Sequence, residues 1–218
     1  MKDNYNKLDQ FYDLYWKYNT ENNSNEILDK LKELANETPE LKGWPENKTK
    51  FWDVESFFWQ LRFKKGEREF IRKLVFEYLS SNHLDVASGS LPINHKCTCI
   101  DISQEMLNSI KTDQTKIVSD LEEPLPFKEN EFKSASCIFI LNYIDNLDQL
   151  LKEIFRILNE DGELVVVLSN KPLAEFHKTK EKNSNDRILE KLEENNFYLT
   201  IQNEEFNGKE LLIIIAKK

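Results

Sequence analysis

The chain has 218 residues, of which 39 are acidic and 30 are lysine or arginine, so its formal net charge is −9. An acidic excess of this size repels phosphate backbones, which argues against a nucleic acid as partner. Its apolar runs are shorter than the roughly 18 residues that cross a bilayer, and its polar beginning, MKDNYNKLDQ, is unlike a signal peptide, so we expect a cytoplasmic protein that does not enter a membrane.

Residues 1–65 are predicted to form a helical lobe or lid. Apolar side chains recur at helical spacing over 8–15 and again over 27–35, with a polar linker between the two segments. Residues 51–63 (FWDVESFFWQLRF) are dense in aromatic side chains. We interpret these aromatics as packing residues, and the alternative is a lid that encloses a cationic group by cation–π contact.

From residue 66 onward, helical and strand patterns alternate. The predicted strands lie at about 83–87, 97–101, 115–118, 134–141, 163–168, 198–206 and 209–216. The predicted helices cover 66–80, a segment that opens near Gln104, 147–158 and 186–195. Asn207 and Gly208 are a strong hairpin signal between the last two strands, and Gly162 is expected to end the preceding helix in a left-handed turn. The pattern predicts an α/β fold whose parallel sheet ends in an antiparallel hairpin.

The three cysteines, Cys97, Cys99 and Cys137, lie inside apolar, strand-like runs. Their odd number and their positions favour buried free thiols in a reducing compartment. The sequence has no further cluster of histidines or cysteines near them, so we predict no metal site.

The most informative segment is 83–101, HLDVASGSLPINHKCTCID. A strand ends in Asp85, a turn of small residues follows, and a second short strand ends in Asp101. Parallel sheets bind ligands at the carboxyl ends of their strands, where a tight turn admits the ligand and a carboxylate can accept both ribose hydroxyls. The segment therefore predicts a site for an adenosine-containing cofactor.

Five consecutive segments resemble the class I S-adenosylmethionine-dependent methyltransferases, in particular the small-molecule branch called the type 11 domain family. They are LDVASGS (84–90), CIDISQEML (99–107), SDLEEPLPF (119–127), EFKSAS (131–136) and ILNYIDNLDQLLKEIFRILNEDGELVVV (140–167). The resemblance covers roughly residues 66–216. It implies a Rossmann-like, mostly parallel seven-stranded sheet with an antiparallel last strand over 66–218, preceded by the helical lobe 1–65.

The resemblance also implies the cofactor, S-adenosyl-L-methionine, and the residues that bind it. The methionine end would be lined by Asp85, Ala87, Ser88 and Gly89. Asp101 would hold the ribose hydroxyls, and Ile102 and Met106 would lie against the adenine ring. Asp120 and the backbone N–H of Leu121 would bind the adenine edge, and Leu141 and Asn142 would border the position of methyl transfer. The alternatives are that Asp101 caps the next helix, that Asp120 forms a turn and that Met106 is a core residue.

The implied activity is methyl transfer to a small-molecule or peptide acceptor, but two features depart from the family's pattern. Ala87 and Leu91 replace two glycines of a G-x-G-x-G turn and leave only Gly89. The 14 positions from Ala87 to Asp101 include Pro92 and leave no room for the usual crossover helix. These departures are the reason to consider the alternative of a cofactor-binding or scaffold protein that has lost turnover, while methyl transfer stays the leading interpretation. We expect the aromatics Phe51, Trp52, Phe57, Phe58 and Trp59 to pack near the resulting gap.

The sequence does not single out a catalytic base. Tyr143, Asp145 and His177 are candidates near the carboxyl ends of strands. The alternatives are that Tyr143 is a wall residue, that Asp145 caps the 147–158 helix and that His177 is exposed in a polar loop.

Overall fold

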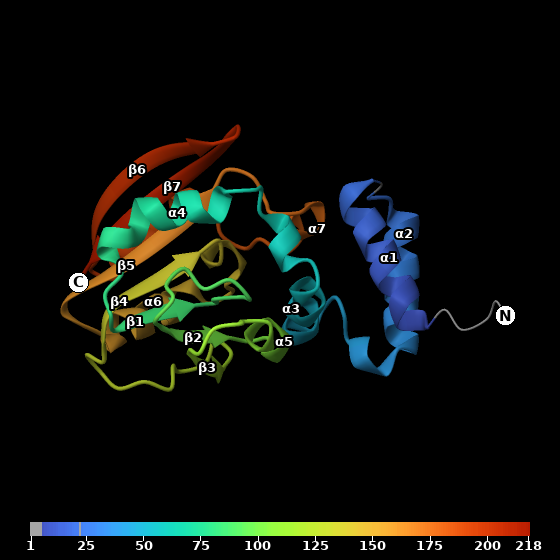
Figure 1. Cartoon of the computed structure of the whole chain (residues 1–218), viewed down its shortest axis with the longest axis horizontal. Coiled ribbons are helices and arrows are strands. Elements are labelled where there is room, and N and C mark those ends of the chain that lie inside the picture. The colour runs from blue at the N-terminus through green and yellow to red at the C-terminus, as the bar shows by residue number, and fades with distance from the viewer. Residues whose placement is uncertain (1–5, 22) are drawn as a thin grey trace.

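The computed structural model describes residues 6–21 and 23–218 (Figure 1). Two helices lie side by side at one end of the molecule, and a sheet with its covering helices makes up the other end. In the amino-terminal lobe the elements are α1 (Lys7–Thr20), α2 (Asn25–Glu37), η1 (Pro39–Leu41), α3 (Lys48–Ser56) and η2 (Trp59–Arg62). None of the helices in the described part of the chain is both long and apolar enough to cross a membrane.

Seven strands form one sheet in the order β3-β2-β1-β4-β5-β7-β6. The strands are β1 (His83–Val86), β2 (Thr98–Asp101), β3 (Thr115–Val118), β4 (Phe132–Ile138), β5 (Leu158–Ser169), β6 (Tyr198–Phe206) and β7 (Lys209–Lys217). Strands β1 to β5 pair in parallel, whereas β7 is antiparallel to both of its neighbours. Asn207 and Gly208 form the predicted turn with positive φ. The Rossmann-like fold that the resemblance implied is confirmed.

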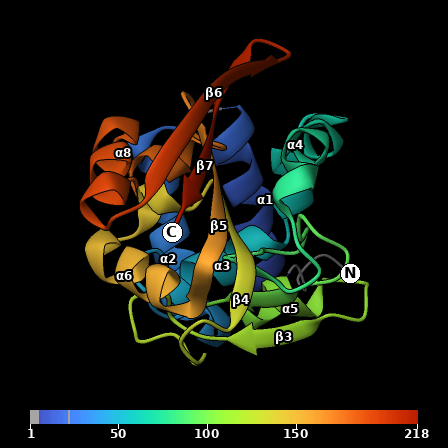
Figure 2. The same ribbon diagram turned by 90° about the vertical axis from the view of Figure 1, so that its left-hand side faces the viewer.

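Helices cover both faces of the sheet (Figure 2). One face carries α6 (Leu147–Ile157) and α8 (Asn185–Glu194), and the other carries α4 (Glu67–Val75) with η3 (Phe76–Tyr78). The apolar stripe of α6, which includes Leu150, Leu151 and Ile154, is fully buried against the sheet. The remaining elements are α5 (Gln104–Asn108), η4 (Leu141–Tyr143) and α7 (Glu175–Lys178).

The connection between β1 and β2 is a loop without a helix, as Pro92 and its short length predicted. Ile93 in this loop is fully buried and packs with the apolar side chains under α4. The backbone N–H of Ile93 donates to Asp85 Oδ2 at 2.6 Å, which fastens the loop to the end of β1. The loop therefore supplies its own cover for this part of the sheet.

The expectation that five lobe aromatics fill this gap is correct only in part. Trp59 lies against the β1–β2 turn at Gly89. Phe51 and Phe58 instead pack within the lobe, and Phe57 is 62% exposed. Trp52 faces the cavity described below.

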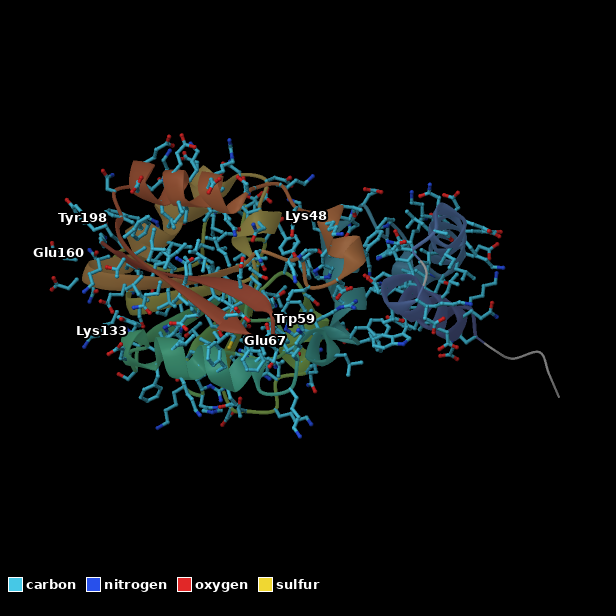
Figure 3. All side chains as sticks on the ribbon, turned by 90° about the horizontal axis from the view of Figure 1, so that it is seen from above. Lys48, Trp59, Glu67, Lys133, Glu160 and Tyr198 are labelled. Carbon is cyan, nitrogen blue, oxygen red and sulfur yellow. The ribbon has the colours of Figure 1, made fainter. Side chains whose placement is uncertain are left out.

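The lobe is held on the domain by a buried polar cluster. Glu55 is fully buried and accepts hydrogen bonds from Tyr15 and from Arg62 Nε at 2.9 Å. His177, from α7, places its Nε2 atom 3.2 Å from the same carboxylate. Phe176 packs with the apolar side chains of the lobe. Seen from above, Lys48 and Trp59 lie toward the lobe, while Tyr198 and Glu160 mark the opposite end of the sheet (Figure 3).

Several local predictions were wrong. Gly162 does not end α6, because the chain passes at Leu158 directly into β5. Position 162 instead requires glycine because of close packing, since a Cβ atom there would lie 2.8 Å from the carbonyl oxygen of Asn159. Asp145 does not cap α6, because Asn146 does. His177 is buried, not exposed, because α7 folds back under the lobe.

Candidate cofactor site

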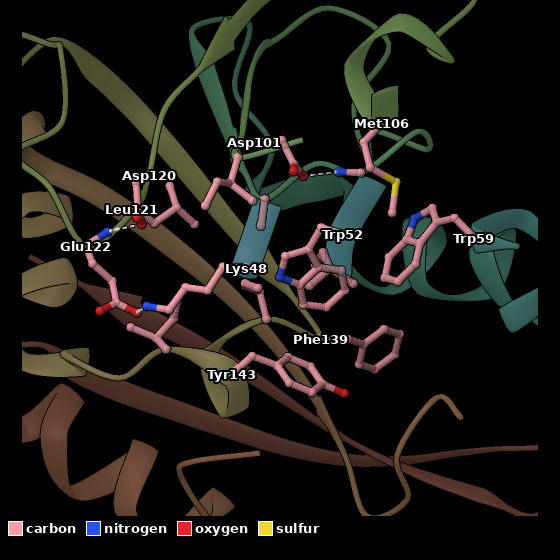
Figure 4. Close-up of a pocket in the computed structure, with 16 residues that line it drawn as sticks. Lys48, Trp52, Trp59, Asp101, Met106, Asp120, Leu121, Glu122, Phe139 and Tyr143 are labelled. Carbon is pink, nitrogen blue, oxygen red and sulfur yellow. Dashed lines mark hydrogen bonds and ion pairs between the residues drawn. The ribbon is translucent and has the colours of Figure 1, made fainter. Parts of the chain in front are cut away.

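A cavity opens where β1, β2 and β4 end, beneath the lobe. Its lining residues are Lys48, Trp52, Trp59, Ala87, Gly89, Asp101, Ile102, Met106, Asp120, Leu121, Glu122, Ile138, Phe139, Ile140, Tyr143 and Ile144. Figure 4 shows Trp52 in the middle of this group, between Asp101 and Tyr143, with Trp59 beside Met106. The cavity is therefore mostly apolar and aromatic, with a few carboxylates on one side.

Asp101 is the central polar group of this cavity and is only 6% exposed. Its Oδ2 atom accepts from the backbone N–H of Gly89, and its Oδ1 atom accepts from that of Ser103, each at 2.9 Å. Burial raises the pKa of Asp101 to about 6, although these two N–H donors act in the opposite direction. Ser103, not Asp101, is the N-cap of α5.

The two hydrogen bonds leave Asp101 able to bind a ligand. A carboxylate oxygen offers two lone-pair directions, and each oxygen of Asp101 uses one of them for a backbone N–H. The backbone N–H of Ile102 also acts on this carboxylate, and the acceptor capacity that remains is available to a hydroxyl group of a ligand in the cavity. The pair of acceptors matches a vicinal diol such as that of a ribose.

Two residues of the lining have a strained backbone. Ala87 has φ +52° and Phe139 has φ +58°, in the left-handed region that residues with a side chain rarely adopt. The alanine that replaces a glycine in the β1–β2 turn therefore keeps the conformation of a glycine. Strain of this kind clusters at binding and catalytic sites, where the surrounding structure holds it in place.

Trp59 closes the cavity at Gly89. A Cβ atom on Gly89 would lie only 2.5 Å from Trp59 Nε1, so the indole ring occupies the space over the turn. The remaining cavity has a volume of about 50 Å³, well below the roughly 300–1,000 Å³ of typical small-molecule sites. A ligand of nucleoside size therefore requires movement of Trp59, Trp52 or both.

The structure brings most of the predicted site residues together. Those that line the cavity are Ala87, Gly89, Asp101, Ile102, Met106, Asp120 and Leu121. Asp120 Oδ1 also accepts from the backbone N–H of Glu122 at 3.0 Å, so it forms a turn while it faces the cavity.

Four predicted residues are not among those that line it: Asp85, Ser88, Leu141 and Asn142. Asp85 is turned toward the β1–β2 loop and accepts from Ile93 and from Ser136 Oγ. Leu141 is buried in the main core, and the Asn142 side chain donates to the carbonyl of Asn183.

The sequence did not assign the lobe residues of this site. Lys48 donates to Glu122 Oε1 at 2.6 Å and pairs with Asp145 Oδ2 at 2.8 Å, which ties α3 across the mouth of the cavity. Ser103 Oγ donates to Asp53 Oδ1 at 2.7 Å and fixes α3 on α5. The aromatic density of 51–63 was the only sequence signal for this arrangement.

Two of the candidate bases lie together. Tyr143 lines the cavity, and its hydroxyl lies 3.3 Å from His177 Nδ1. His177 in turn faces Glu55, so a buried line of polar groups runs from the cavity wall into the lobe. Burial raises the pKa of Tyr143 above its usual range, which keeps the phenol protonated.

Comparison with known proteins identifies the central segment. Residues 81–166 match the family model described as a methyltransferase domain. This segment belongs to the methyltransferase domain family. The cavity lies at the strand ends of this methyltransferase domain, and the family match ends before α8 and the final hairpin.

One relative is similar in sequence, and two solved structures share the fold. The ubiquinone/menaquinone biosynthesis C-methyltransferase UbiE of Rickettsia bellii is 31% identical over 134 residues, which are 52% of this chain and 50% of that protein. The chain thus spans about half the length of this relative. A SAM-dependent methyltransferase of Archaeoglobus fulgidus has the same fold, with a TM-score of 0.62, 16% identity and coverage of 74% of this chain and 99% of that one. The [4+2]-cyclase SpnF also shares the fold, with a TM-score of 0.64, 14% identity and coverage of 78% and 95%.

Proposed function

We propose that the protein transfers a methyl group from S-adenosyl-L-methionine to a small-molecule or peptide acceptor. The observation that carries the proposal is the buried Asp101 carboxylate at the end of β2, which is fixed by backbone N–H groups and lines an aromatic cavity. The match of residues 81–166 to a methyltransferase domain supports it. A cytoplasmic setting and the lack of a nucleic acid partner remain predictions from the sequence.

The polar and apolar groups of the site fit this cofactor. Asp101 would accept the ribose hydroxyls, Ile102 and Met106 would contact the adenine ring, and Asp120 with the Leu121 N–H would bind its edge. Ala87 and Gly89 would face the methionine part. The cofactor supplies an electrophilic methyl group on a sulfonium centre, and the protein's part is alignment and removal of water.

Asp85, Ser88, Leu141 and Asn142 would act indirectly in this proposal. Asp85 holds the β1–β2 loop, and Leu141 and Asn142 position the end of β4. Ser88 is buried beside Gly89. We propose them as positioning residues of the turn and of the strand end.

The aromatic lid has a role in this proposal beyond packing. Trp52, Trp59 and Tyr143 line the cavity, and aromatic faces would attract a cationic group such as the sulfonium of the cofactor. If the acceptor loses a proton during methyl transfer, that proton could pass along the contacts from Tyr143 to His177 and from His177 to Glu55. The closed cavity implies that the lid opens to admit the cofactor and closes over it afterwards.

One observation favours a second function. The cavity is small and Trp59 covers the turn, as expected of a protein that keeps the fold as a scaffold and has lost turnover. The two functions differ in cofactor binding and in product formation.

Calorimetry with S-adenosylmethionine and S-adenosylhomocysteine tests the proposal. We expect the wild-type protein to bind both, and Asp101→Asn to weaken binding by about a hundredfold through loss of two charge-assisted hydrogen bonds. Asp161→Asn is the control, because Asp161 is an exposed aspartate of β5 that lies outside the cavity lining. Absence of binding at millimolar cofactor would reject the proposal and favour the scaffold. Turnover is tested separately by release of S-adenosylhomocysteine when a small-molecule extract is added as a source of acceptors.

A further inference from the structure

A second and larger cavity lies on the face of the sheet where the crossover helix is absent. It has a volume of about 510 Å³ and lies between α4, the β1–β2 loop and the residues that follow α5. We call it the basic groove and define it by Lys64, Lys65, Arg68, Arg72, His95 and Lys111, all of which line it. Its volume falls in the range of small-molecule sites.

The charge of this groove is opposite to that of the whole chain. Its described lining holds five lysines and arginines but a single carboxylate, that of Glu69. Glu69 is already paired with Arg72, whose Nη1 atom lies 2.7 Å from Glu69 Oε1. In a chain of net charge −9, this concentration of unneutralised positive charge is a marked local exception.

Arg68 is the half-buried cation of the groove that has no ion pair among the described residues, whereas the half-buried Arg72 is paired with Glu69. None of the described carboxylates lies within ion-pair distance of its guanidinium group, whose Cζ atom lies 5.9 Å from the centre of the Phe63 ring. The carboxylates that act on it electrostatically are Asp85 and Glu69, and both already accept other hydrogen bonds. Burial lowers the pKa of Arg68 to about 10, so the group stays charged at neutral pH. A half-buried charge without an ion-pair partner is unfavourable, which points to an anion that completes the site.

Ser90 is an independent sign of a missing ligand. It lines the groove and is only 4% exposed, and its Oγ atom has no hydrogen-bond partner among the described residues. Buried hydroxyl groups are nearly always hydrogen-bonded in folded proteins. Ser90 follows Gly89 directly, so the two faces of one turn line the cofactor cavity and the basic groove.

We propose that the basic groove binds a phosphate-bearing small molecule. A guanidinium fork binds two phosphate oxygens at once, and lysines add point charges around it. Five cations against one paired carboxylate suit a multiply charged anion such as a diphosphate or triphosphate group. The proposal does not depend on methyl transfer, because none of the six groove-defining residues lines the cofactor cavity.

The test is calorimetry of the full-length protein with inorganic tripolyphosphate at two salt concentrations. We expect binding that weakens as salt rises, and a loss of about tenfold or more on Arg68→Gln. Lys65→Gln and Lys111→Gln, which change exposed residues, should each weaken binding by a smaller factor. Lys133→Gln is the matched control, since Lys133 is exposed but distant from the groove, and it should leave binding unchanged.

A measurement on the free protein separates the proposal from a purely structural role of Arg68. If the role of Arg68 is to bind an anion, Arg68→Met should melt at the same temperature as the wild type or higher. The wild type should gain more stability from tripolyphosphate than the variant does. A lower melting temperature for Arg68→Met together with no response of the wild type to tripolyphosphate would overturn the proposal. An equal effect of Lys133→Gln and Lys111→Gln on binding, or tighter binding of single-stranded RNA than of tripolyphosphate, would overturn it as well.

Discussion

Glu55 is predicted to control the stability of the whole chain, because it joins the lobe to the methyltransferase domain. Its carboxylate is fully buried and contacts Tyr15, Arg62 and His177. Burial alone would raise the pKa of Glu55, but His177 and Arg62 lower it from 4.5 to about 2. A difference of this size corresponds to about 3 kcal/mol of folding free energy.

Glu55→Gln should therefore lower the free energy of unfolding by about 3–5 kcal/mol at pH 7, since it leaves the buried Arg62 without a charged partner. The pKa of Glu55 is lower in the folded state, so its contribution is complete above pH 4.5 and is lost as the pH falls toward 2. The difference between wild type and variant should shrink over that range. Urea unfolding monitored by tryptophan fluorescence measures both effects.

The control is Glu37→Gln, in the same lobe, because Glu37 pairs with Lys7 on the surface and should contribute less than about 1 kcal/mol. A loss below about 1 kcal/mol for Glu55→Gln at pH 7, or a loss that does not change with pH, would refute the reasoning.

Three further predictions concern the cavity. Ala87→Gly should stabilise the protein by about 1 kcal/mol in urea unfolding, because it relieves a positive φ, whereas Ala135→Gly in β4 should destabilise it. Gly89→Ala should lower the free energy of unfolding by about 1–3 kcal/mol, because its new methyl group would contact Trp59. The decrease should be smaller when Trp59 is also replaced by alanine. A double-mutant cycle that shows no coupling between the two positions would contradict this. Affinity for S-adenosylhomocysteine should fall as the pH drops below about 6, because protonated Asp101 loses acceptor capacity; a flat pH profile would count against its role.

Elements with a regular pattern were predictable from the sequence. Strand β3 was predicted at 115–118 and found at Thr115–Val118, and the hairpin at Asn207 was placed correctly. These features depend on local periodicity and turn chemistry, which neighbouring residues determine. The carboxylate at the end of β2 was predictable for the same reason.

Long-range packing accounts for what the sequence did not reveal. His177 lies in a polar stretch yet is buried, because Glu55 and the lobe aromatics reach it from more than a hundred residues away. The basic side chains of the groove are spread from Lys64 to Lys111 and alternate with acidic residues, so only the fold gathers them. The closure of the cavity by Trp59 depends on the path of the lobe, which local patterns do not encode.

A crystal structure of the protein with S-adenosylhomocysteine tests the central claim most directly. We predict electron density for the nucleoside with both ribose hydroxyls on Asp101 and with Trp59 displaced from Gly89. Density that shows the indole still over the turn, Asp101 bound only to Gly89 and Ser103, and no ligand at saturating concentration would contradict it.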